Sequence, residues 1–314
     1  MFPFMKLKWL SLSVSALLIA GTLYGTYQIR QGFNKGIDFS GGIKLEVELN
    51  DKVSIDSLRS FFKDNNWNAV VQKADKADSQ MAKIELGGKE EKILQDLASK
   101  NKEELEKAKL SENSVDYLKL LMRQKLSSEY PEKINFIGVD QVGPTIGKYL
   151  TDSAIKLLLV TIILITVYIT FRFKFHFALG AMIALFHDLF LTLGVIGFFE
   201  IPLSIPVVAA LLTILGYSIN DTIVIFDRIR ENMSSQDNYS VEVVVNQSIN
   251  ESLSRTVITS LTTLLAVIAV FILAEDALRE MAQVLIIGII IGTYSSSFVA
   301  SPVIVLFEKF SKKR

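Results

Sequence analysis

Six long stretches of this sequence are almost free of charge, and they constrain the fold more than any other feature. A helix needs about 20 apolar residues to cross the hydrocarbon core of a bilayer. Each stretch is near or above that length, although some contain ionisable residues. They lie at residues 9–29, 150–171, 177–199, 202–226, 252–274 and 281–307. The sequence therefore predicts a multi-pass α-helical membrane protein with six transmembrane helices.

Most charged residues gather in one block between the first two stretches. The chain of 314 residues has 33 basic and 33 acidic side chains, and residues 30–149 hold 20 of each. A block so rich in charge belongs in water, so we expect a folded domain outside the membrane there.

Composition excludes several classes of function. The chain has no cysteine and only two histidines, His176 and His187, which excludes cysteine-ligated metals, thiol nucleophiles and histidine-rich metal sites. A net charge of zero argues against nucleic acid as a partner, because phosphate binding needs a basic surplus. The sequence also lacks a nucleophile elbow and a phosphate loop. We therefore expect neither an enzyme nor a cofactor.

Basic residues in the short flanks of the stretches predict the orientation. On one side of a six-span arrangement lie Lys6, Lys8, Arg172, Lys174, Arg228, Arg230, Lys309, Lys312, Lys313 and Arg314. The short loops on the other side offer only Arg279. We therefore expect residues 1–8, a loop or amphipathic segment at 227–251 and the tail 308–314 in the cytoplasm. Residues 30–149 are then extracytoplasmic.

The first stretch also resembles a secretory signal peptide. Its apolar part is long for that role, and Ile19-Ala20-Gly21 followed by bulky Leu23 is a poor cleavage site. We expect it to remain as a membrane anchor.

The extracytoplasmic block has the pattern of an α+β domain. Short alternating segments predict strands, and longer amphipathic segments predict helices. The predicted strands are 43–49, 69–72, 81–86 and 134–142, and the predicted helices are 54–65 and 89–127, the second broken near 111–114. The order β-α-β-β-α-β predicts a ferredoxin-like fold.

Asp221 is the clearest ionisable residue inside an apolar stretch. It follows twenty uncharged residues and comes seven before Arg228, which places it roughly 10 Å inside the cytoplasmic boundary of a helix. A charged side chain at a helix centre costs about 2.5 kcal/mol or more, so we expect a functional site or a buried pair. Tyr217 and Ser218 share its helix face.

The fifth stretch offers a matching basic residue. A polar helix face recurs there at spacings of three and four, formed by Ser252, Arg255, Thr259 and Thr262. We expect Arg255 at a depth similar to Asp221. Two interpretations are open: the two charges form a structural ion pair, or Asp221 is a titrating acid whose pKa the arginine modulates.

His187 and Asp188 lie near the middle of the third stretch. They form either a hydrogen-bonded pair that fixes helix packing or a secondary relay, and both interpretations stay open. The same two interpretations apply to Ser218, Asn220 and Thr259.

Several motifs occur in a recognisable order along nearly the whole chain. The longest is GYSINDTIVIFDRIREN at 216–232, which contains Asp221. The shorter ones are GIDFSGG at 36–42, VGP at 142–144, ALFHD at 184–188, SRTVITSL at 254–261 and GTYSS at 292–296. Together they resemble the SecF family, the smaller members of the SecD/SecF pairs of bacterial protein export.

The resemblance implies half of an RND-type helix bundle in the bacterial cytoplasmic (inner) membrane. It implies partnership with SecD and the SecYEG channel, and use of the proton-motive force, or of sodium, to help draw preproteins across the membrane. The resemblance also implies that Asp221 corresponds to the proton-carrying aspartate of the family and Arg255 to the arginine across from it. It implies that SecD supplies a second acid. Residues 89–127 depart from the family, being longer and more charged.

The remaining motif residues and the small residues of the last stretch are expected to be structural, because small residues allow close helix approach. They are Asp38, Gly41, Gly42, Gly143, Pro144, Gly216, Gly288 and Gly292.

Two other functions fit the same residues. The chain is half of an RND-like exporter of small molecules or lipids that uses the same acid, or it is a passive membrane scaffold in which Asp221 and Arg255 form a structural pair.

Overall fold

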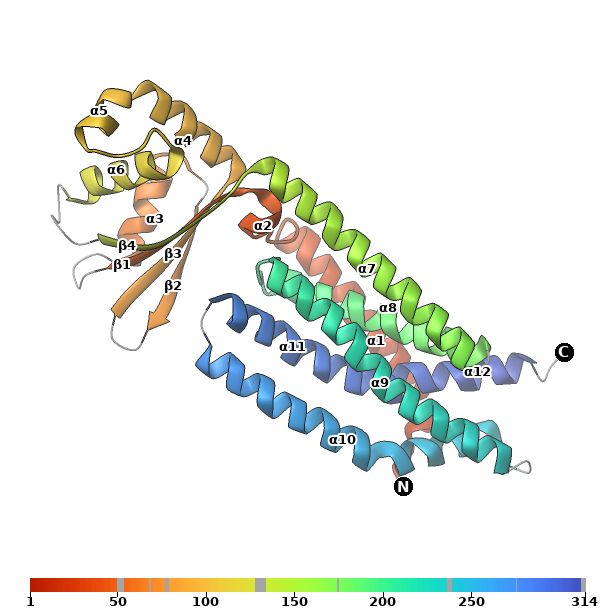
Figure 1. Ribbon diagram of the computed structural model, residues 1–314. Coiled ribbons are helices and arrows are strands. Elements are labelled where there is room, and N and C mark those ends of the chain that lie inside the picture. The colour runs from red at the N-terminus through yellow and green to blue at the C-terminus, as the bar shows by residue number, and fades with distance from the viewer. Residues whose placement is uncertain are drawn as a thin grey trace. The chain divides into compact units, whose positions relative to one another are not determined.

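The structure is a computed structural model. It describes residues 1–49, 54–67, 69–76, 79–127, 134–173, 175–235, 239–274 and 276–311. The chain divides into two compact units, a helical unit of residues 1–34 with 154–314 and an α+β unit of residues 35–153 (Figure 1).

The α+β unit is built on a four-stranded antiparallel sheet in the order β2-β3-β1-β4. Its strands are β1 (Gly42–Leu49), β2 (Ala69–Lys76), β3 (Ser79–Gly87) and β4 (Ile134–Val142). Its helices are α2 (Ile37–Ser40), α3 (Ile55–Asp64), α4 (Gly88–Lys100), α5 (Lys102–Lys107) and α6 (Ser114–Ser127). The predicted long helix at 89–127 is therefore three helices, with an interruption at Asn101 as well as near the predicted break.

Apolar residues alternate with polar ones along β1, and the apolar ones form part of the core of this unit. Ile43, Leu45 and Val47 are fully buried and pack with Leu58 of α3 and Leu94 of α4. Because successive side chains of a strand point to opposite faces, the polar residues between them face away from this core.

The turn before β1 needs glycine. Gly41 and Gly42 have φ angles of 69° and 133°, which L side chains rarely adopt. A Cβ on Gly42 would lie 2.0 Å from the carbonyl oxygen of Leu86 on β3. A Cβ on Gly41 would lie 3.1 Å from Cα of Pro144, the first residue of α7 (Pro144–Arg172). The two glycines therefore let β1, β3 and the start of α7 approach one another closely.

Six helices of the described chain are long and apolar enough to cross a membrane, as the sequence predicts. α1 (Lys8–Tyr24) is flanked by the short helical segments η1 (Phe4–Leu7) and η2 (Gly25–Ile29). α11 (Asp276–Ser295) continues through η3 (Ser296–Ala300) into α12 (Ser301–Ser311). The other spans are α7, α8 (Phe175–Phe198), α9 (Ile205–Ser235) and α10 (Val241–Leu273).

α9 and α10 are longer than the apolar stretches that predicted them. α9 continues to Ser235 and α10 begins at Val241, so most of segment 227–251 is helical. Ile229 and Val245 are fully buried in this extension. Tertiary packing therefore continues both helices past the point where their hydropathy falls.

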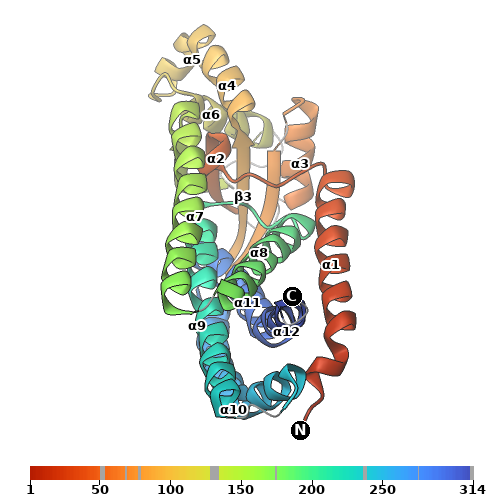
Figure 2. The same ribbon diagram turned by 90° about the vertical axis from the view of Figure 1, so that its right-hand side faces the viewer.

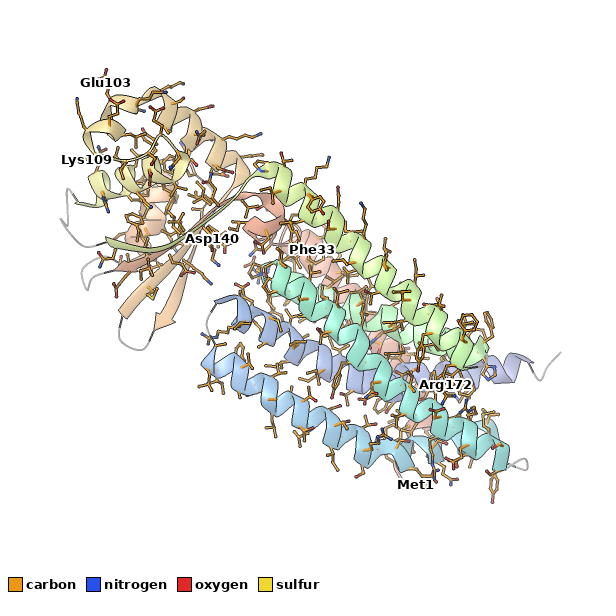
Figure 3. All side chains as sticks on the ribbon, viewed as in Figure 1. Met1, Phe33, Glu103, Lys109, Asp140 and Arg172 are labelled. Carbon is orange, nitrogen blue, oxygen red and sulfur yellow. The ribbon has the colours of Figure 1, made fainter. Side chains whose placement is uncertain are left out.

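α8 and α11 form the centre of the helical unit. In the apolar segment of α8, 61% of the residues are buried, and the span that contains α11 has the same share. The corresponding shares are only 6% for α7 and 11% for α10. Figure 2 shows α11 and α12 between α1 and α9. In Figure 3, Met1 and Arg172 lie at one end of this unit and Phe33 lies at the other.

Candidate functional site

Among the described residues of the helical unit, two carboxylates are buried in membrane-spanning helices. Asp188 on α8 is 0% exposed and Asp221 on α9 is 2% exposed. Both lie in helices that can span a membrane, where an uncompensated charge is costly. The groups that contact these two acids therefore determine what the site can do.

Asp221 is held by a hydroxyl chain that joins three helices. Ser260 Oγ of α10 donates to Asp221 Oδ2 at 3.2 Å, and Thr293 Oγ1 of α11 donates to Ser260 Oγ at 2.8 Å. Ser260 and Thr293 are not among the site residues predicted from the sequence. A signal was present, because Ser252, Thr256 and Ser260 recur at a spacing of four, and all three are buried.

Arg255 does not make the direct contact with Asp221 that the interpretation of a structural ion pair requires. Its side chain is exposed, and among the described residues no ion pair joins the two. The reason is the rotation of α10, which turns Ser252, Thr256 and Ser260 inward instead of Arg255, Thr259 and Thr262. Arg255 lines a cleft of about 690 Å³ with the charged residues Arg172, Asp227, Arg228, Arg230, Glu231 and Glu251.

Tyr217 and Thr259 lie at the contact between α9 and α10. The Tyr217 hydroxyl donates to the carbonyl oxygen of Thr259 at 3.1 Å, so Thr259 contacts α9 through its backbone. Asn220 and Gly216 are exposed on α9, and no atom would meet a Cβ on Gly216 within 4 Å. These two residues therefore leave part of α9 uncovered in this chain.

Asp188 accepts hydrogen bonds from three elements. Ser295 Oγ of α11 donates to Asp188 Oδ2 at 2.8 Å, and the Ser218 hydroxyl of α9 donates to the same oxygen. His187 Nδ1 lies 2.8 Å from Asp188 Oδ1. The structure thus brings the predicted residues His187, Asp188 and Ser218 together and adds Ser295.

Small residues let α9 and α11 approach closely. A Cβ on Gly292 would lie 2.9 Å from Cβ of Ser218, and a Cβ on Gly288 would lie 2.1 Å from Ile214 Cδ1. The remaining predicted structural residues belong to the other unit, where Asp38 is in the first turn of α2 and a Cβ on Gly143 would meet no atom within 4 Å.

We expect Asp188→Ala to destabilise the helical unit by about 2 kcal/mol, because Ser218, Ser295 and His187 lose a shared buried acceptor. Thermal unfolding of the purified chain in detergent measures the loss. Asp188→Asn keeps a hydrogen-bond acceptor in a side chain of the same shape. It should lower the free energy of unfolding by less than half as much as Asp188→Ala. Equal melting temperatures for wild type and Asp188→Ala would contradict a packing role.

The chemistry available at this site is proton or cation exchange by a carboxylate. Within the residues that the structure describes, no group of three His, Asp or Glu side chains is placed to hold a metal ion. Both acids have hydroxyl partners, which can donate to an ionised carboxylate or accept from a protonated one.

A six-helix unit with two buried acids, joined to an antiparallel α+β unit, defines an integral membrane protein with an acid-bearing helix bundle. The family model described as protein export membrane protein SecD/SecF, C-terminal, matches residues 122–310. The model of the SecD/SecF GG motif matches residues 29–53. The chain belongs to the SecD/SecF family of protein export membrane proteins.

The relatives to which this chain is similar include proteins named protein translocase subunit SecF. That of Thermodesulfovibrio yellowstonii is 35% identical over 311 residues, which cover 98% of this chain and 95% of the relative. That of Rickettsia felis is 35% identical over 316 residues, which cover 99% and 94%. The chain is accordingly a SecF-type, membrane-embedded component of the protein translocase.

The fold is also similar to a solved structure. The crystal structure of SecDF, a translocon-associated membrane protein from Thermus thermophilus, matches with a TM-score of 0.79 and 33% identity over 98% of this chain. This chain spans 39% of the length of that SecDF chain.

Proposed function

We propose that this chain couples the proton-motive force to the late stage of preprotein export, acting with SecD and the SecYEG channel in the bacterial cytoplasmic membrane. Asp221 carries the proton in this account, and Arg255 responds to its charge. Membership of the SecD/SecF family supports this proposal, and so do the residues around Asp221.

The observation that carries the proposal is that the direct partner of buried Asp221 is a hydroxyl. A carboxylate in hydrocarbon with a neutral partner is costly when ionised, and taking up a proton removes that cost. A purely structural pair would instead place Arg255 against the acid. The exposed position of Arg255 therefore favours an exchanging acid over a passive scaffold.

A two-state mechanism follows from this geometry. With Asp221 protonated, Ser260 and Thr293 hold α9, α10 and α11 together as described here. With Asp221 ionised, its charge attracts Arg255, and α10 turns or shifts to bring the guanidinium closer. Moving one charge through the membrane field is worth ~2.3 kcal/mol per 100 mV, which is enough to bias two states that differ by a few kcal/mol.

SecD is proposed to cover the polar part of α9 that this chain leaves exposed. Thr213, Gly216 and Asn220 recur at spacings of three and four on a helix that spans the membrane, and all three are exposed. Small and polar residues on a lipid-facing surface are typical of contacts between transmembrane helices. A SecD helix packed there would bring its own acid close to Asp221.

The orientation and the cargo contact complete the proposal. The basic flanks of the spans favour cytoplasmic termini, which places the unit of residues 35–153 outside. We assign the contact with emerging preprotein to that unit. Export of small molecules or lipids is the competing function, and no contact described here favours it over protein export.

The test uses inverted membrane vesicles that contain this chain, SecD and SecYEG. Preprotein export is measured while the proton gradient and the sodium gradient are collapsed separately. We expect export to slow when the proton gradient is lost and to continue when only sodium is equilibrated. The opposite result would assign the coupling to sodium, and indifference to both gradients would contradict the proposal.

A further inference from the structure

A second site lies on the helical unit, on the side of α10 away from the cleft of Arg255. It is a cavity of about 400 Å³ between α10, α11 and η3, with Phe4 of η1 at its margin. Its walls are mostly apolar, with Val257, Leu261 and Leu264 on α10 and Ile290 on α11. Its size falls in the range of ligand sites in proteins.

The cavity opens toward the hydrocarbon of the membrane. From Leu253 to Leu264, its wall follows α10 for about 16 Å, entirely inside a helix that can span a bilayer. Val257, Leu261 and Ile290 are exposed in this chain, so they form an open rim. An apolar cavity does not hold water well, and an apolar chain from the bilayer is the ligand that its position offers.

One hydroxyl in the wall has no hydrogen-bond partner in the part of the chain that the structure describes. Thr256 is 2% exposed, and among the described residues its Oγ1 has no hydrogen-bond partner. By contrast, Thr259, Thr262 and Thr263 on the same helix each donate to the carbonyl oxygen four residues earlier. Thr256 therefore offers a donor to an acceptor in the cavity, such as an ester carbonyl.

An exposed cation lies at the same end of the helices. The backbone of Phe2 is tied to α10, because Phe2 N donates to Asn250 Oδ1 at 2.7 Å and Asn250 Nδ2 donates to Phe2 O at 2.9 Å. These two hydrogen bonds hold η1 against α10, and Phe4 of η1 lines the cavity. Lys6 of η1 is exposed, whereas Lys8 pairs with Glu242. Exposed Lys6 matches the phosphate of a lipid at the membrane surface.

We propose that this cavity binds an anionic glycerophospholipid of the surrounding bilayer. One acyl chain fills the apolar wall along α10, an ester carbonyl accepts a hydrogen bond from Thr256 Oγ1, and the phosphate lies near Lys6. Ser260 and Thr293 also line the cavity, so the bound acyl chain keeps water from the hydroxyls that hold Asp221. The lipid site does not depend on which ion drives export.

The test is native mass spectrometry of the full chain after reconstitution with phosphatidylglycerol or phosphatidylcholine and extraction in mild detergent. Leu261→Trp fills the cavity from its rim. Leu265→Trp is the matched control, because Leu265 is similarly exposed on the same helix but does not line the cavity. We expect Leu261→Trp to lower retention of phosphatidylglycerol about tenfold and Leu265→Trp to leave it unchanged.

Two further variants test the polar contacts without filling the cavity. Thr256→Val removes one hydrogen bond and should weaken retention about fivefold at an unchanged melting temperature. Lys6→Gln should remove the preference for phosphatidylglycerol over phosphatidylcholine. Equal retention by Leu261→Trp and Leu265→Trp would overturn the proposal, and so would cross-linking of position 261 to a second polypeptide in membranes.

Discussion

Replacing Asp221 by Asn should reduce gradient-driven export at least tenfold when the chain is assembled with SecD and SecYEG. Asparagine preserves the shape of the side chain and can still accept a hydrogen bond from Ser260, so the helix packing survives. It cannot exchange a proton, and the attraction between an ionised acid and Arg255 never arises. A loss of this size corresponds to about 1.4 kcal/mol or more of coupling free energy. The measurement is the rate of preprotein export in energised vesicles.

Asp227→Asn is the matched control for that result. Asp227 lies on the same helix, but it is partly exposed and forms an ion pair with Arg172 at 3.1 Å. Exposed ion pairs contribute little, so this variant should export at nearly the wild-type rate. Equal losses in both variants would show that α9 tolerates no change of charge, and the specific role of Asp221 would then be wrong.

Gly42→Ala should destabilise the α+β unit by about 3 kcal/mol or more. The new Cβ would press against the carbonyl oxygen of Leu86, which is part of the strand backbone and cannot move aside as a flexible side chain can. The residue would also keep a positive φ that alanine rarely adopts. Thermal unfolding followed by the fluorescence of Trp67, which is buried in this unit, reports the change.

Gly143→Ala is the control, because Gly143 directly follows Val142, which pairs with Gly42. A Cβ at Gly143 would meet no atom within 4 Å. The midpoint temperature of thermal unfolding should therefore stay near that of wild type. If both variants unfolded at the wild-type temperature, the steric account of the turn would be contradicted.

The spans could be predicted from the sequence because membrane crossing depends on a local property. Roughly 20 apolar residues are required wherever a helix meets hydrocarbon, whatever its neighbours are. The extensions of α9 to Ser235 and of α10 back to Val241 could not be predicted in this way. They are stabilised by buried contacts between the two helices, which hydropathy does not report.

The rotation of α10 is the part of the site that the sequence could not predict. Spacing in the sequence places Arg255, Thr259 and Thr262 on one face, but it does not say which face packs against α9. In the structure the inward face is one residue further along, at Thr256 and Ser260. Tertiary packing decides this rotation, and one residue on a helix turns a side chain by about 100°. The buried acids were predictable because an isolated charge in an apolar stretch needs an explanation of its own.

Separating the proton gradient from ATP tests whether Asp221 couples that gradient to export. A preprotein is arrested partway across inverted vesicles that contain the chain, SecD and SecYEG, ATP is removed, and a proton gradient is then imposed. We expect the preprotein to advance to completion with the wild-type chain and to stay arrested with Asp221→Asn. Completion at the same rate with both chains would contradict this role of Asp221.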